Sequence, residues 1–297
     1  MLSASPLLLN RLLEADGFEL SRTLVFRHRP WEPALNRVFD WIVAERRDLF
    51  DTYQSTHGAN TEAALGRASH VASFIRYKPK KALFVGLYEV VDQRTITVEE
   101  YRGRPLHQEL MALGMDGHKA SDGRHSVIEF AMRDCGWHSD WSQRLIIDWP
   151  GLERSWYRWA DRNQFTVSAV AEEPLLVTQM PDWQHLSLDW NQLRFLPSSW
   201  KAALSHWRGI YLIIDRSDGM QYVGSACGQE NILQRWYDYV RTGHGGNKLL
   251  KRRDPTNFVF SILQRVSPDL PENEVIAVEQ SWKLRLRTRA PSGLNEN

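Results

Sequence analysis

Two apolar segments separated by a turn signal place the strongest constraint on how this 297-residue chain folds. Gly209–Ile214 and Gln221–Val223 have the composition of β-strands, and Asp218 and Gly219 lie between them. A tight hairpin turn needs positive φ angles, which glycine adopts without a steric penalty. The pattern therefore predicts an antiparallel β-hairpin.

The segments after the hairpin predict a small mixed domain. Residues 230–241 carry apolar side chains at helical spacing, and residues 258–266 alternate as a third strand would. Pro271 suits the first turn of a helix, and the acidic residues after it favour a helix over residues 272–288. The predicted order is β-β-α-β-α, with a three-stranded antiparallel sheet flanked by helices.

Tripeptides on both strands of the hairpin carry a resemblance to a known family. The first strand begins with Gly-Ile-Tyr (209–211), and the second contains Tyr-Val-Gly (222–224). Over residues 205–297 the chain resembles the GIY-YIG nuclease superfamily. The remaining signature residues follow in order and on the expected elements: Arg235, Tyr239, Glu279 and Asn295. The resemblance implies an α+β domain that hydrolyses DNA phosphodiesters to 5′-phosphate and 3′-hydroxyl ends with Mg²⁺ or Mn²⁺.

Two tyrosines of the hairpin and two residues of the next helix are the predicted catalytic groups. Because Tyr211 and Tyr222 lie at adjacent strand ends, their hydroxyl groups can converge. A free tyrosine has a pKa of about 10, so the resemblance implies that a metal ion and Arg235 favour the phenolate of Tyr211, which acts as general base. Arg235 would also hold the phosphate oxygens, and Tyr239 would orient a water or contact the phosphate. The structural alternatives are two half-buried strand tyrosines, a surface pair of Arg235 with Asp238 or Glu230, and a packing role for Tyr239.

Glu279 is the predicted metal ligand. A single carboxylate, completed by waters and a substrate phosphate, suits Mg²⁺ or Mn²⁺. The competing interpretation is an ion pair with Lys283 on the surface of the same helix. Asn295 would hold the phosphate or the water shell of the metal, and a frayed tail is its alternative.

A glycine-rich loop and a basic run supply the predicted DNA contacts. His244 lies in Thr-Gly-His-Gly-Gly-Asn-Lys (242–248), where glycines let the backbone approach a phosphate closely. His244 would act as a second acid or base or contact the substrate, and a helix C-cap loop explains it equally well. Residues 235–265 hold seven lysines and arginines against two aspartates, which fits either a DNA-binding face or a solvated one. The predicted DNA-binding residues are Asn247, Lys248, Lys251, Arg252 and Arg253.

Residues 1–172 predict a second α+β domain, with an antiparallel sheet or a small barrel. Helical spacing predicts one amphipathic helix over residues 34–52. Apolar runs predict buried strands at 82–91, 143–148 and 165–171.

Glycine and proline predict where this first domain is irregular and where it ends. Four glycines and a proline break up residues 101–125, so loops are expected there. Three prolines punctuate residues 173–204, which we interpret as a connector to the nuclease-like domain at 205–297.

Tryptophan suggests a function for the first domain. The chain has 13 tryptophans, and five of them fall between residues 137 and 159. Aromatic faces stack on flipped or modified bases, although packing in the core explains any single tryptophan better. From Phe26-Arg27-His28 to the segment 146–156, the chain also resembles a bacterial group of GIY-YIG restriction-like proteins. The implied role is DNA recognition, with a modified base as one candidate ligand.

The sequence thus predicts a restriction or defence endonuclease. A DNA repair nuclease, a mobile-element nuclease and a non-catalytic DNA-binding protein remain open as alternatives. One such site cuts one strand, so double-strand cleavage would need a homodimer or two sequential nicks. Two cysteines fit a reducing cytoplasm, and no stretch approaches the ~18 apolar residues of a membrane span. No Walker loop, dinucleotide-binding fingerprint or Ser-His-Asp order supports nucleotide hydrolysis or acyl transfer.

Overall fold

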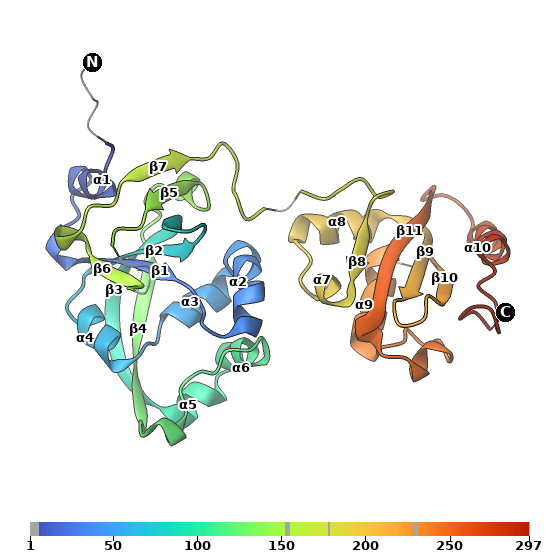
Figure 1. The fold of residues 1–297 in the computed structure, drawn as a ribbon, viewed down its shortest axis with the longest axis horizontal. Coiled ribbons are helices and arrows are strands. Elements are labelled where there is room, and N and C mark those ends of the chain that lie inside the picture. The colour runs from blue at the N-terminus through green and yellow to red at the C-terminus, as the bar shows by residue number, and fades with distance from the viewer. Residues whose placement is uncertain (1–5, 152–154, 178, 229–230, 297) are drawn as a thin grey trace, which may run out of the picture. The chain divides into compact units, whose positions relative to one another are not determined.

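The chain folds into two units, Met1–Val177 (unit 1) and Thr178–Asn297 (unit 2). A computed structural model describes residues 6–151, 155–177, 179–228 and 231–296 (Figure 1). The division at residue 177 differs from the connector predicted over residues 173–204, because most of that segment is folded into unit 2.

Unit 1 contains a seven-stranded sheet of order β6-β1-β2-β3-β5-β7, with β4 paired to β3. β1 and β2 run parallel, and the other pairs are antiparallel. The strands are β1 Thr23–His28, β2 His70–Arg76, β3 Lys81–Thr97, β4 Ser126–Asp134, β5 Leu145–Asp148, β6 Tyr157–Trp159 and β7 Val167–Val170.

Helices pack on both faces of this sheet (Figure 1). One face buries Ile75 and Val85 against Phe39 and Leu49 of two helices, and the other buries Phe74 and neighbours against the first helix. The α-helices are α1 Leu9–Ala15, α2 Pro33–Glu45, α3 Arg47–Gln54, α4 Ala59–Leu65, α5 Val98–Gly103 and α6 Pro105–Ala112. Short 3₁₀ turns lie at η1 Leu20–Arg22, η2 Ala120–Asp122, η3 Ser139–Trp141 and η4 Ala160–Arg162.

Unit 1 confirms the mixed α+β class and differs from the prediction in three details. The helix predicted over 34–52 is two helices, because Arg46 leaves helical geometry at φ −132° and ψ 64°. Part of the loop predicted at 101–125 is helical, since Pro105 begins α6 at a position where proline is tolerated. Among the described strands no pairing joins β6 to β7, so the sheet is open rather than a small barrel.

Unit 2 contains a four-stranded antiparallel sheet of order β10-β9-β11-β8. Its strands are β8 Ser187–Asp189, β9 Arg208–Asp215, β10 Gln221–Ala226 and β11 Phe258–Val266. Its helices are α7 Trp190–Arg194, α8 Ser198–His206, α9 Asn231–Thr242 and α10 Glu272–Leu286, with 3₁₀ turns η5 Leu250–Arg252 and η6 Pro255–Asn257. After residue 205 the order of strands and α-helices is β-β-α-β-α.

The segment predicted as a connector supplies part of the core of unit 2. Its apolar side chains, including Leu188, Trp190 and Leu204, pack in one cluster with Tyr211 and Trp236. β8 also pairs with β11, which makes the sheet four-stranded rather than three-stranded. Burying this apolar surface offsets the entropy of ordering the segment.

The two faces of the unit 2 sheet are covered by different helices. α9 packs on the face of Tyr211 and Ile213, and α10 packs on the face of Ile210 and Leu212. This alternation follows from the two-residue repeat of a strand.

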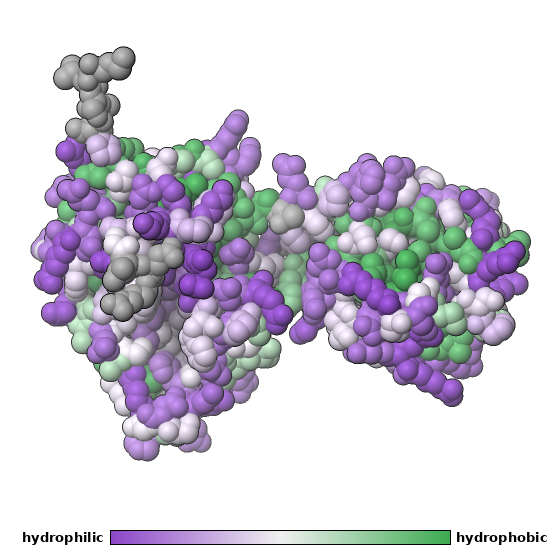
Figure 2. All heavy atoms as spheres, viewed as in Figure 1, coloured by the Kyte–Doolittle hydropathy of each residue, from purple (hydrophilic) through white to green (hydrophobic). Residues whose placement is uncertain are grey.

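The visible surface of both units is mixed, with hydrophilic and hydrophobic areas side by side (Figure 2). Hydrophilic residues cover much of both units in the view of Figure 2. Within the described part of the chain, no helix has the length and apolar character needed to cross a lipid bilayer.

Candidate active site

The glycines of the two tripeptides are required by close contacts. A Cβ atom on Gly209 would lie 2.2 Å from the carbonyl oxygen of Gln264 on β11. A Cβ atom on Gly224 would lie 2.4 Å from the hydroxyl oxygen of Tyr211. The first glycine therefore lets the sheet close around a bulge, and the second makes room for the Tyr211 ring over β10.

Four of the predicted catalytic residues lie together on the α9 face of the sheet. The hydroxyl oxygens of Tyr211 and Tyr239 are 3.1 Å apart, and the Arg235 guanidinium lies 3.5 Å from the Tyr211 hydroxyl. The ring of Tyr222 lies within 6.4 Å of both other tyrosine rings, measured between centroids. We call these residues, Tyr211, Tyr222, Arg235 and Tyr239, the tyrosine cluster.

The four residues of the tyrosine cluster differ in how deeply they are buried. Tyr211 and Tyr239 have no exposed surface, whereas Tyr222 and Arg235 are partly exposed. Burial raises the pKa of Tyr211 and of Tyr239, and it outweighs the Arg235 charge, which acts to lower both. Arg235 alone therefore does not supply a Tyr211 phenolate, and the prediction that a metal ion acts with Arg235 to favour this form stays a prediction.

Glu279 lies against β10 from the opposite side. One carboxylate oxygen is 2.7 Å from the Lys283 ammonium, and the other accepts a hydrogen bond from the Ser225 hydroxyl. The side chains of Lys283 and Glu279 are only 6% and 13% exposed, so this is a largely buried pair rather than a surface one. Both the ion pair predicted as an alternative and a carboxylate close to the hairpin are therefore present.

The edge of the sheet connects the tyrosine cluster and Glu279. β10 is an edge strand of the described sheet, with Tyr222 and Gly224 on one face and Ser225 on the other. Gly224 has no side chain, so the Tyr211 ring can lie over β10 at this position. The tyrosine cluster and the Glu279 carboxylate therefore lie against opposite faces of the same edge strand.

Asn295 covers the preceding stretch of the same edge. Its side-chain oxygen accepts from the Val223 amide at 3.0 Å, and its side-chain nitrogen donates to the Val223 carbonyl at 2.8 Å. Leu294 adds a backbone bond to Gln221 at 2.8 Å. The buried Asn295 amide pairs with the strand backbone as a neighbouring strand would, so the alternative of a frayed tail is wrong, and the phosphate or water-shell role stays a prediction.

The glycine-rich loop lies against the tyrosine cluster. A Cβ atom on Gly245 would lie 2.6 Å from the Tyr239 ring, and Gly245 also has a positive φ of 56°. In the loop, Nδ1 of His244 accepts from the Gly246 amide at 2.9 Å. Asn247 is corrected to a structural residue, because its side chain accepts from the amides of Leu249 and Leu250 at the start of η5.

The predicted basic DNA contacts divide into exposed and internally paired residues. Lys251 and Arg252 are exposed, and Lys248 is 76% exposed beside Glu296 at 3.7 Å. Arg253 instead pairs with the nearly buried Asp215 at 2.7 Å and with Asp218. Its guanidinium thus pairs with two carboxylates at the turn end of the hairpin, and its predicted DNA contact stays a prediction.

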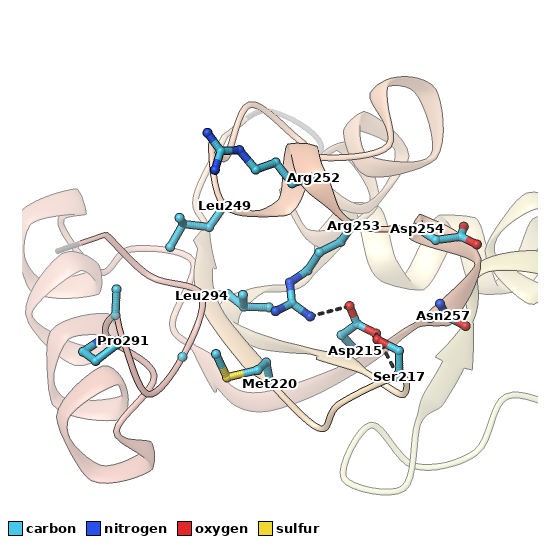
Figure 3. Close-up of a pocket in the computed structure, with 12 residues that line it drawn as sticks. Asp215, Ser217, Met220, Leu249, Arg252, Arg253, Asp254, Asn257, Pro291 and Leu294 are labelled. Atoms are coloured by element: carbon cyan, nitrogen blue, oxygen red, sulfur yellow. Dashed lines mark hydrogen bonds and ion pairs between the residues drawn. The ribbon is translucent and has the colours of Figure 1, made fainter.

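A cavity of about 540 Å³ lies beside this pair (Figure 3). Burial would raise the pKa of Asp215, yet hydrogen bonds from Ser217 and Arg253 hold this pKa below its usual value. Figure 3 shows Arg253 directed at Asp215 and Arg252 directed away from it. The charges of Asp215 and Arg253 at this cavity therefore already neutralise each other.

The donor set near Glu279 suits a hydrated hard cation. Among the residues that the structure describes, no three His, Cys, Asp or Glu side chains are grouped as metal ligands. Mg²⁺ keeps several waters and needs only one or two carboxylates, which a lone Glu279 at an open edge provides. The Lys283 ammonium holds one oxygen of that carboxylate, so Lys283 and a metal ion compete for it.

Ser225 and Lys283 contact Glu279, and only Lys283 could be anticipated as its partner. Lys283 follows Glu279 by one helical turn. Ser225 comes directly after the second tripeptide, but its partner is 54 positions away in the sequence. Strand alternation places Ser225 on the face opposite Tyr222, and the position of α10 decides what it meets.

Comparisons with known proteins give limited matches. No family model matches the chain, and no curated protein matches it. The solved catalytic domain of the homing endonuclease I-TevI aligns with 30% of this chain and 96% of its own, at 26% identity and a TM-score of 0.25. A mutant of the catalytic domain of the intron endonuclease I-TevI aligns with 31% and 94%, at 26% identity and a TM-score of 0.26. Similarity of this size does not establish a family, so the functional inference depends on the contacts described above.

Proposed function

We propose that unit 2 is a divalent-metal-dependent DNA endonuclease domain of the GIY-YIG type. The observation that carries this proposal is the tyrosine cluster, in which residues from β9, β10 and α9 meet around one arginine beside an open strand edge. The spacing of the signature residues supports the same assignment. The reaction is hydrolysis, in which water adds to phosphorus and the bond to the 3′ oxygen breaks, leaving 5′-phosphate and 3′-hydroxyl ends.

Arg235 and Tyr222 are the groups that face the substrate phosphate. Arg235 is 35% exposed, and its planar fork suits two phosphate oxygens. Tyr222 is the partly exposed tyrosine of the cluster, so its hydroxyl is the one that can reach a phosphate or the attacking water. Tyr211 acts through Arg235, because its buried hydroxyl accepts a hydrogen bond from the guanidinium, and the Tyr239 hydroxyl in turn bonds to that of Tyr211.

Glu279 is the residue that would hold Mg²⁺ or Mn²⁺. A bound ion would neutralise charge on the phosphate and on the leaving oxygen. Ser225 fixes the orientation of the Glu279 carboxylate. Lys283 balances its negative charge when no metal ion is bound.

Unit 1 supplies DNA recognition in this proposal, and the whole protein acts as a restriction or defence enzyme in the cytoplasm. A single site of this kind cuts one strand, so a double-strand break requires a homodimer or two successive nicks.

Plasmid nicking tests the metal assignment. With Mg²⁺ we expect Glu279→Gln to nick supercoiled plasmid at least about 100-fold more slowly than the wild type, as lost charge stabilisation predicts. Glu274→Gln is the matched control, because Glu274 is exposed on the same helix. Calorimetric titration with Mn²⁺ gives a second readout, and Glu279→Gln should lose this binding.

Two results would contradict the proposal. Equal nicking by wild type and Glu279→Gln would show that this carboxylate holds no catalytic metal. DNA binding without cleavage, on unmodified, 5-methylcytosine and 5-hydroxymethylcytosine plasmids, would instead identify a non-catalytic DNA-binding protein.

A further inference from the structure

Unit 1 contains a cavity of about 480 Å³ that the proposed nuclease chemistry does not use. Its lining comes from the end of β1, from α3 and α5, and from the loops around residues 31, 57 and 117, with Trp156 beside them. This volume falls within the ~300–1,000 Å³ of small-ligand sites. Aromatic rings form much of the lining: Trp31, Tyr53, Tyr101 and Trp156.

Two buried histidines form part of the lining. His28 and His57 are 1% and 9% exposed, and their rings are nearly parallel, with centroids 6.5 Å apart. Burial lowers the pKa of His28 to about 3 and that of His57 to about 4. Both imidazoles are therefore neutral at pH 7.

Gln54 fixes how these neutral rings are oriented. His28 is hydrogen-bonded to the Gln54 side chain and His57 to the Gln54 backbone. Both bonds raise the pKa of the imidazole, so in each the ring N–H donates. Nε2 of each ring has no hydrogen-bond partner within the described part of the chain, which leaves Nδ1 as the donor to Gln54. Each Nε2 is then an unused acceptor.

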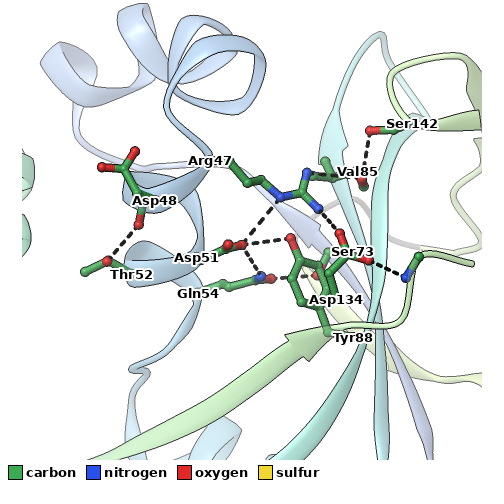
Figure 4. Close-up of polar contacts among 11 residues, drawn as sticks. Arg47, Asp48, Asp51, Thr52, Gln54, Ser73, Val85, Tyr88, Asp134 and Ser142 are labelled. Atoms are coloured by element: carbon green, nitrogen blue, oxygen red, sulfur yellow. Dashed lines mark hydrogen bonds and ion pairs between the residues drawn. The ribbon is translucent and has the colours of Figure 1, made fainter. Parts of the chain in front are cut away.

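A polar network holds Gln54 itself in place (Figure 4). Its side-chain oxygen accepts from Ser73 at 2.7 Å, and its side-chain nitrogen donates to Asp51 at 3.3 Å. Asp51 also accepts from the Tyr88 hydroxyl at 2.8 Å and lies 3.5 Å from the Arg47 guanidinium. The network ties α3 to β2 and β3, so the two imidazoles are held in position before any ligand arrives.

We infer that this cavity binds one unstacked nucleobase that carries an exocyclic amino group, such as cytosine, a 5-substituted cytosine or adenine. The aromatic rings stack on the base, and its amino group donates two hydrogen bonds to Nε2 of His28 and of His57. Trp156 packs on both imidazoles, with ring centroids 5.9 and 5.2 Å away, and is the side chain that the base displaces to reach them.

The chemistry of the site favours amino-bearing bases over thymine. Buried acceptors without donors are costly, and a base with an amino group satisfies them. Thymine has an oxygen acceptor in place of the amino group and a single ring N–H donor, so it leaves at least one of the two nitrogens unpaired. Trp31 is 74% exposed at the cavity, where it can stack on an arriving base without disturbing the core.

Such a base has two possible sources, a DNA strand or a free nucleotide. DNA as the source rests on the proposed function of unit 2, whereas the binding chemistry does not. The lack of excess positive charge over residues 1–200, with 23 basic against 26 acidic residues, suits a site that reads one base rather than a long phosphate track.

Fluorescence anisotropy of the full chain tests the inference. The probes are a 15-nucleotide thymidine strand, the same strand with one central deoxycytidine, and the mononucleotides of both bases as competitors. Glu279→Gln protein without divalent cations is used, so cleavage does not interfere. We expect the deoxycytidine strand to bind about ten-fold or more tightly than the thymidine strand.

Two variants should abolish this preference. His57→Phe removes one acceptor together with the ring donor to the Gln54 backbone, so a modest fall in melting temperature is expected for it. Trp31→Ala removes only an exposed stacking face, so it should leave the melting temperature unchanged. His107→Phe is the matched control, because His107 is equally buried in unit 1, has two unpartnered ring nitrogens and does not line the cavity. It should bind like the parent protein.

The outcomes separate the inference from the nuclease proposal. A preference shown as strongly by the mononucleotide as by the strand supports the base site with a free nucleotide as ligand, and a preference confined to the strand supports it with DNA. Equal binding of both strands, or a preference that survives His57→Phe, overturns the base site. Tight Zn²⁺ binding that is lost in His57→Phe also overturns it, in favour of a metal site. A protein that shows the preference but nicks no DNA refutes only the nuclease proposal.

Discussion

The tyrosine cluster of unit 2 and the histidine pair of unit 1 differ in how their buried polar groups are satisfied. In unit 2, the buried hydroxyls of Tyr211 and Tyr239 bond to each other, Arg235 donates to the Tyr211 hydroxyl, and Glu279 is neutralised by Lys283. In unit 1, His28 and His57 keep nitrogens without partners beside a cavity. A satisfied cluster is rigid and ready for a charged group at its surface, while an unsatisfied one lacks a donor that only a ligand or a water supplies.

The largest expected effect is on catalysis in unit 2. We expect Arg235→Ala to lower the nicking rate about 10²–10³-fold, because it removes a preorganised charge from the phosphate. Arg235→Lys should recover only part of the rate, since a lysine ammonium cannot form the bidentate fork. Timed plasmid nicking measures both.

Arg241→Ala is the control for Arg235. Arg241 pairs with the same Asp238 from the same helix but is 75% exposed. Wild-type rates for Arg235→Ala, in a protein with unchanged circular dichroism, would remove the tyrosine cluster from the proposed mechanism.

A smaller effect is expected on the stability of unit 2. Gly224→Ala places a methyl group 2.4 Å from the Tyr211 hydroxyl, and this ring is enclosed between β10 and α9. We expect the free energy of unfolding of unit 2 to fall by about 1–3 kcal/mol, the usual effect of overpacking. Urea unfolding measures the change.

Gly228→Ala is the matched substitution, because a Cβ atom there meets nothing within 4 Å. Equal stability of the Gly224 and Gly228 variants would mean that the Tyr211 ring is free to move, and the cluster would then not be preorganised.

Acid should destabilise unit 1 before unit 2. His28 and His57 have lowered pKa values in the folded protein, so below about pH 6.5 the unfolded chain binds more protons and the stability of unit 1 falls with pH. Each histidine contributes on the order of 1 kcal/mol per pH unit between its unfolded and folded pKa values. The buried tyrosines of unit 2 have raised pKa values, so their contribution is lost only above about pH 10.

Hydrogen-exchange mass spectrometry at pH 7 and pH 5 reports on the two units separately. Protection should fall more steeply in unit 1, and His28→Phe should reduce that dependence. A pH dependence unaltered by His28→Phe would show that this ring is not held neutral by burial.

Local sequence patterns predicted the parts of unit 2 that depend on nearby residues. The hairpin follows from apolar segments around Asp218 and Gly219, and β11 matches the alternation at 258–266. The contacts that the patterns missed join distant segments. β8 pairs with a strand some 70 residues later, and Asn295 pairs with Val223.

Partners across the fold also decided the role of the charged residues. The basic run in the sequence predicts Arg253 as a DNA contact, yet Asp215 on a preceding strand neutralises its charge. No sequence pattern relates His28 to His57. The two residues line one cavity only because the fold brings β1, α3 and the loop after α3 together.

The two residues that seal β10 have a consequence for the integrity of the protein. Leu294 and Asn295 occupy the hydrogen-bonding groups of Gln221 and Val223 that an additional strand would otherwise take. Proteolytic trimming of these residues would convert that rim into a template for strands of other molecules. By pairing with β10, Leu294 and Asn295 therefore limit self-association of the protein through this edge.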